Sequence, residues 1–156
     1  MIDIPETAQR NIAALYEKDE RAVALLHLGE RDALLTISAG GELYTARRID
    51  VSAGDARAAA ERERFDAHER LLLEVQRSLD HFERQFGAIA VARLMLAPEA
   101  GESGLLEHFR DNLGVPIARV RLAEVLEVPG GEIARDAEWR LFHLIGASLR
   151  HEAAAL

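Results

Sequence analysis

The sequence predicts an α/β domain with a five-stranded mixed sheet and helices on its faces. Three strand-like segments follow one another near the N-terminus and are separated by tight turns. Helical and strand-like segments then alternate to the C-terminus. Three strands joined by hairpins and followed by crossover connections give both antiparallel and parallel pairs. The length of 156 residues is that of one domain.

The N-terminal part is predicted to be a short helix followed by three strands. Asp3 and Glu6 have the spacing of a capping box at the start of that helix. Gly40 and Gly41 favour a tight hairpin, because glycine tolerates positive φ. The strands are predicted at residues 22–28, 33–38 and 43–51. The first is apolar nearly throughout, which is typical of a strand buried on both faces.

The C-terminal part alternates helices and strands. Helical periodicity is strongest from about Asp66 to Phe86, where large apolar residues recur at three- and four-residue spacings. Leu79 and Phe82 lie on this stripe and are predicted to face the sheet. The remaining elements are predicted as strands at 89–97 and 115–120, a short helix at 104–113 capped by Ser103, and a last helix from Asp136 to about His151.

Composition narrows the class of protein. Apolar residues make up 49% and charged residues 29%, as in a soluble globular domain. The 19 basic and 27 acidic residues give a net charge of -8, which argues against nucleic acid as a partner. Cysteine is absent, so disulfides and thiolate chemistry are excluded. With neither a signal-peptide pattern nor an apolar run of about 20 residues, we expect a cytoplasmic protein without direct membrane insertion.

Motifs for catalysis or metal binding are weak. No two histidines have the i, i+4 spacing of a helical metal site, and His68, His81 and His108 are expected on helix surfaces. Ser103 does not lie in a GxSxG motif and is better explained as a helix cap. The carboxylates between residues 61 and 84 alternate with arginines, which indicates a solvated helix face. Catalytic and metal-binding residues are therefore predicted as none.

Two glycine-containing loops, after residue 28 and after residue 97, could cradle a phosphate through backbone N–H groups. Four acidic side chains crowd these loops and would repel a polyphosphate unless magnesium intervened: Glu30, Asp32, Glu99 and Glu102. Plain turns are the favoured interpretation.

The chain resembles the second half of the PilM/MshI family, the actin-like proteins of type IV pilus assembly. The most specific segment is Gln76-Arg77-Ser78-Leu79-Asp80-His81-Phe82-Glu83. Weaker matches are residues 2–11, 26–37, 41–49, 113–117 and 145–150. The closest similarity is to the MshI branch, named for biogenesis of the mannose-sensitive haemagglutinin (MSHA) pilus.

The resemblance implies an actin-like, ribonuclease-H-like fold, with residues 1–156 forming a single domain. The subdomain that the family often inserts after the third strand would be reduced to about 52–66. The implied function is a cytoplasmic scaffold of a pilus assembly platform, peripheral to the inner membrane through its partners. Those partners would include a PilN-like membrane protein, which the family binds mainly through its first half.

Departures from the family pattern argue against nucleotide binding. Nucleotide-binding members carry an aspartate where this chain has His27, and a hydroxyl residue after the glycine that corresponds to Gly29. The glycine-rich adenosine loop is replaced by Ala97, Pro98 and Glu99. Proline lacks an N–H and the glutamate adds negative charge. We therefore expect no cofactor and no ATP hydrolysis.

Two alternatives belong to other classes. An actin-like ATPase of pilus or type II secretion assembly would need ATP affinity despite His27 and Glu99. A ribonuclease-H-like nuclease would need an acidic residue on the first strand, which has none.

The last helix carries an apolar face, formed by Trp139, Phe142, Ile145 and Leu149. In a full-length actin-like protein this helix lies near the junction with the first domain. An apolar face of this kind is usually buried against another surface. The helix is therefore predicted either to pair with a second copy, giving a homodimer, or to fold back onto the sheet, and its face is a candidate interaction surface.

Overall fold

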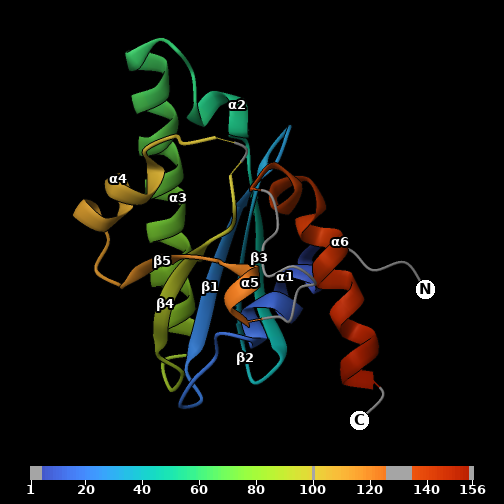
Figure 1. Ribbon diagram of the computed structural model, residues 1–156. Helices are drawn as coiled ribbons and strands as arrows, with labels where there is room; N and C mark the ends of the chain where they lie inside the picture. Colours follow the sequence, from blue (N-terminus) through green and yellow to red (C-terminus); the bar gives the residue numbers. More distant parts are fainter. Residues whose placement is uncertain (1–4, 100, 126–134, 155–156) are drawn as a thin grey trace.

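The computed structural model describes residues 5–99, 101–125 and 135–154, in which a helix and three consecutive strands are followed by further helices and two more strands (Figure 1). The strands are β1 (Ala22–Leu28), β2 (Ala33–Ala39), β3 (Glu42–Ile49), β4 (Val91–Leu96) and β5 (Ile117–Arg119). The helices are α1 (Pro5–Ala14), α2 (Ala53–Ala56), α3 (Glu61–Gln85), α4 (Leu105–Asn112), α5 (Leu122–Val125) and α6 (Arg135–Ala154).

The five strands form one mixed sheet in the order β3-β2-β1-β4-β5. The hairpin-linked strands β1, β2 and β3 pair antiparallel, whereas β4 lies parallel to both β1 and β5. All seven residues of the central strand β1 are buried. The predicted mixed sheet, with helices on its faces and a doubly buried first strand, is therefore confirmed.

Helices cover both faces of the sheet and close two apolar cores. Side chains alternate between the faces along a strand, so β1 contributes to both cores. Ala24 and Leu26 face the core under α3 and α4, together with Val75, Phe82 and Phe109. The second core lies under α1, α5 and α6 and contains Ile12, Val23, Leu25, Leu122 and Phe142. Figure 1 shows α3 and α4 on one side of the sheet and α1 and α6 on the other.

Some predicted boundaries differ from the structure. Helix α3 begins at Glu61, five residues before the predicted start, and Glu61 and Glu63 lie in its first turn. Acidic side chains there interact favourably with the helix dipole, so the turn forms without an apolar face. Strands β4 and β5 are shorter than predicted at both ends. The predicted cap Asp3 lies outside the described residues.

The region 52–66 holds α2 and the first turns of α3. The Ser52 hydroxyl accepts from the Asp55 N–H at 3.1 Å, and the Asp55 carboxylate accepts from the Ser52 N–H at 2.9 Å. This reciprocal capping box defines the short helix. That the region is what remains of an inserted subdomain stays a prediction.

Candidate functional site at the carboxyl end of the sheet

The predicted loop positions lie at the carboxyl ends of β1 and β4. Strands β1 and β4 are parallel neighbours, so their carboxyl ends lie side by side. The Ala97 N–H donates to the Leu26 carbonyl at 2.9 Å, which joins the two strand ends. His27 and Gly29 therefore lie at the same end of the sheet as Pro98 and Glu99, although the side chains of His27 and Glu99 contact different partners, Phe142 and Arg119.

His27 is enclosed by helix α6. Its ring stacks on Phe142 with centroids 5.3 Å apart and planes 10° apart, and the His143 ring lies 4.2 Å away. The pKa of His27 is lowered to about 3, mainly by burial and also by nearby His143, while a hydrogen bond with the Trp139 backbone acts in the opposite direction. His27 is therefore a neutral imidazole at neutral pH, where a magnesium-organising aspartate would carry a negative charge.

The backbone groups of Gly29 form hydrogen bonds within the fold. Its N–H donates to the Asp32 carbonyl and its carbonyl accepts from the Ala53 N–H, both at 2.8 Å. A Cβ at this position would lie 2.9 Å from the Asp32 carbonyl oxygen, so the tight turn requires glycine. The Asp32 carboxylate pairs with Arg48. The backbone groups of Gly29 that could face a phosphate already have partners.

Glu99 is buried, and both of its carboxylate oxygens have a partner. It is 2% exposed, and its carboxylate lies 3.1 Å from the Arg119 guanidinium. The Ser103 hydroxyl donates to its other oxygen at 2.5 Å. The same hydroxyl accepts from the Leu105 N–H at 3.1 Å, so Ser103 satisfies the start of α4 although Gly104 holds the N-cap position. These contacts connect the loop after β4 to β5 and to the start of α4.

The apolar face predicted on the last helix packs inside the molecule. Phe142 is fully buried, Ile145 and Leu149 pack on the core under α1, and the Trp139 indole N–H donates to the Leu28 carbonyl at 2.8 Å. The structure has the second of the two predicted arrangements, in which the helix folds back onto the sheet. Among the described side chains of α6, the large apolar ones that are exposed are instead Leu141 and Leu144, at 44% and 67%.

Polar contacts that the sequence did not reveal also hold α6. Nε2 of His143 lies 2.9 Å from the Gln9 amide oxygen, and the Gln9 amide nitrogen donates to the Thr36 hydroxyl at 3.1 Å. The Asn11 amide donates to the Gly146 carbonyl at 3.1 Å. Gln9 is fully buried. The position of Gln9 beside the apolar stripe of α1 could have indicated that it is buried. Its hydrogen-bond partners lie more than 15 residues away in the sequence, so no local pattern identifies them.

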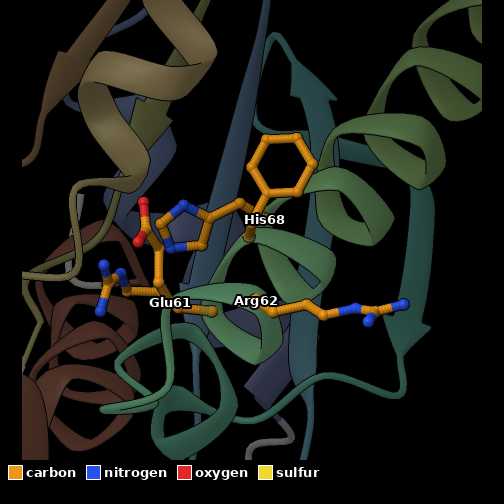
Figure 2. Close-up of a pocket in the computed structure, with 5 residues that line it drawn as sticks. Glu61, Arg62 and His68 are labelled. Carbon is orange, nitrogen blue, oxygen red and sulfur yellow. The ribbon is translucent and has the colours of Figure 1, made fainter.

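A hollow of about 540 Å³ lies at the start of α3. In Figure 2, Glu61 and His68 point to the same side of the helix and Arg62 points away. The prediction that His68 is a surface residue is wrong, because it is 6% exposed and its Nε2–H donates to the Ala56 carbonyl at 2.9 Å. Burial lowers the pKa of His68. Its role is to join α2 to α3.

Within the described ranges, no three histidine or acidic side chains are grouped so that they could hold a metal ion. None of the helices in those ranges is both long enough and apolar enough to cross a membrane.

Comparison with known proteins shows the fold. No family model and no curated protein matches the chain. A chain of the solved PilM–PilN type IV pilus biogenesis complex is similar, with a TM-score of 0.69 and 20% identity over 96% of this chain. This chain spans about half of that one (52%).

Weaker likenesses are an Aquifex aeolicus Ppx/GppA family protein and the apo psk41 ParM protein. The first has a TM-score of 0.46 and 16% identity, over 64% of this chain and 35% of the other. The second has a TM-score of 0.48 and 11% identity, over 96% of this chain and 50% of the other. The PilM–PilN match and the sheet order confirm the predicted actin-like, ribonuclease-H-like fold.

Proposed function

We propose that this chain is a scaffold domain of a type IV pilus assembly platform. The observation that carries the proposal is the fold shared with a chain of the PilM–PilN pilus biogenesis complex over 96% of the residues. The run Gln76–Glu83, which resembles the PilM/MshI family, lies on α3 beneath the same sheet. The resemblance to the MshI branch favours a platform of the MSHA type.

We propose further that the domain does not hydrolyse ATP. In an actin-like ATPase, backbone amides hold the phosphates and a carboxylate organises magnesium. Here the Gly29 amide is bonded to Asp32, and Glu99 is buried against Arg119. His27, which replaces the aspartate, is packed under Phe142. Each of these positions is therefore already bonded to, or packed against, another residue of the fold.

The proposed partner is a PilN-like membrane protein, which would hold the domain at the cytoplasmic side of the inner membrane. Because the chain spans about half of its structural relative, other parts of such a protein could supply much of that contact. A bacterial two-hybrid screen against the cytoplasmic segments of pilus platform proteins tests the role. We expect an interaction with at least one, and none with their periplasmic domains. Failure of every cytoplasmic segment to interact would contradict the pilus proposal.

Calorimetry with ATP and magnesium separates the scaffold from the ATPase. We expect no binding tighter than about millimolar, which corresponds to roughly 4 kcal/mol. Saturable binding in the micromolar range would establish a nucleotide site and favour the ATPase. A His27→Asp variant is the matched comparison, since it restores the residue type of nucleotide-binding members at the same position.

A further inference from the structure

A small apolar pocket lies at the opposite end of the sheet from the loops described above. Its volume is about 250 Å³, and it opens between the last turns of α3, the loop that follows, and the start of β4. The apolar side chains that line it are Leu79, Ile89, Ala90, Val91 and Val115. Sites for drug-sized ligands span about 300–1,000 Å³, so this pocket has room for little more than one side chain.

The pocket exists because two elements stop short of covering this corner. Strand β5 pairs with β4 only from Leu94 onward, so Val91 and its neighbours have no strand on that side among the described residues. Helix α3 ends at Gln85, and the chain turns away at Gly87. Leu79, Ile89 and Val115 pack against the core but remain only partly buried.

The rim of the pocket attracts positive charge. Glu83 lines it and, within the described part of the chain, has neither an ion pair nor a side-chain hydrogen bond. Gly87 also lines it, just beyond the C-cap Phe86, where the last carbonyls of the 25-residue helix α3 carry partial negative charge. Arg84, the basic residue of the last turn, does not line the pocket. A carboxylate and a helix C-terminus therefore face the same opening.

We infer that this pocket binds a peptide segment of a partner protein, through one apolar side chain that lies next to a lysine or arginine. The apolar side chain fills the cavity over Leu79 and Val91, and the neighbouring cation contacts Glu83 and the end of α3. The combination of one apolar anchor and one adjacent cation is a feature of a peptide. This site does not depend on the pilus role proposed above.

Methyl NMR of the full chain tests the inference with three capped dipeptide amides. We expect acetyl-Leu-Arg-amide to shift the methyl signals of Leu79, Ile89, Val91 and Val115 in a saturable manner at about 10 mM, ten times a millimolar Kd. Acetyl-Leu-Glu-amide replaces the cation by an anion and tests whether binding requires positive charge. Acetyl-Ala-Arg-amide shortens the apolar side chain and tests whether binding requires the anchor. Both should bind more weakly. No saturable shift with the Leu-Arg probe, or equal affinity for all three probes, would overturn the site.

Two variants locate the binding within the pocket. Glu83→Gln should weaken the Leu-Arg probe by about two- to fivefold, the range of an exposed ion pair, and leave the Leu-Glu probe without that loss. Ala90→Leu places a larger side chain in the cavity and should abolish binding. Ala88→Leu is the matched control, since Ala88 is exposed in the same loop and does not line the pocket. Retained binding in Ala90→Leu, or an unchanged affinity in Glu83→Gln, would contradict the inference.

Discussion

Gly146 is the residue on which the close packing of α6 against α1 most directly depends. A Cβ at this position would lie 2.4 Å from the Ala8 carbonyl oxygen. In an exposed helix, replacing glycine by alanine stabilises by roughly 1 kcal/mol. Here we expect the opposite sign, a loss of about 1–3 kcal/mol in the free energy of unfolding, because the added methyl overpacks the contact.

Urea unfolding monitored by fluorescence of Trp139, the only tryptophan, measures this change. Ser148→Ala, on the exposed side of the same helix, is the control and should stay within about 0.5 kcal/mol of the parent. A stabilised Gly146→Ala protein would show that the two helices do not approach this closely.

Leu79 and Phe82 lie on the same stripe of α3 but differ in burial. Phe82 is fully buried, whereas Leu79 is partly buried and lines the small pocket. Phe82→Ala should therefore cost about 3–5 kcal/mol in unfolding free energy. Leu79→Ala should cost less than about 2 kcal/mol, since its site already borders a cavity. Equal losses, measured by urea unfolding, would contradict this ranking.

The loop positions of the candidate site could be predicted from the sequence, but their contacts could not. His27 lies near the end of β1 and Glu99 just after β4, and parallel strands end on the same side of a sheet, so their location at one end of the sheet follows from element order. That Glu99 pairs with Arg119 depends on how β5 sits beside β4, which no local pattern encodes. The burial of Gln9 likewise depends on tertiary packing, since its bonds reach β1 and β2.

At the scale of the element, two histidines where α6 meets the sheet, His27 on β1 and His143 on α6, make the packing of α6 depend on pH. Burial lowers the pKa of His27 to about 3 and that of His143 to about 4, from 6.5. Glu6 raises the pKa of His143 and Arg48 lowers it. Above pH 6.5 both imidazoles are neutral in the folded and the unfolded chain. Below it the unfolded chain binds protons first, so stability present above pH 6.5 is lost as the pH falls toward 4 and 3.

We expect the free energy of unfolding to fall between pH 6.5 and about 4.5, by up to about 1.4 kcal/mol per pH unit for each imidazole. Urea unfolding across this range measures the slope. His27→Phe keeps an aromatic ring against Phe142 and should reduce the slope, whereas His81→Gln, at an exposed position of α3, should not. An unchanged slope in His27→Phe would rule out this histidine as a source.

Sequence patterns predicted the centres of the helices and strands better than their ends. The centre of α3 was predictable from its apolar stripe, because four buried residues, Leu71, Leu72, Val75 and Phe82, recur at helical spacing. Its first turn has no such stripe and no side-chain cap, and the favourable interaction there is that of Glu61 and Glu63 with the helix dipole. Strand β5 has three residues, whereas β3 at the other edge of the sheet has eight, so position in the sheet alone does not set strand length.

At the scale of the whole molecule, α6 decides whether the chain needs a partner to cover its apolar surface. The pattern of Trp139, Phe142, Ile145 and Leu149 could not distinguish a helix that folds back from one that pairs with another copy, because both bury the same face. The structure has the face packed on α1 and the sheet, and two other side chains, Leu141 and Leu144, on the outside. The two exposed leucines are fewer than the four apolar side chains of the packed face.

We therefore expect the chain to be a monomer of 17.2 kDa by light scattering. The Trp139 ring is partly buried and its N–H is bonded to the Leu28 carbonyl, so its emission should be blue-shifted relative to the unfolded chain. Because this burial is intramolecular, dilution should leave the emission maximum unchanged. A red shift on dilution would mean that a second copy covers Trp139. A dimer whose emission does not change would place the contact on the outer face, and Leu144→Ala should then restore the monomer whereas Ser148→Ala should not.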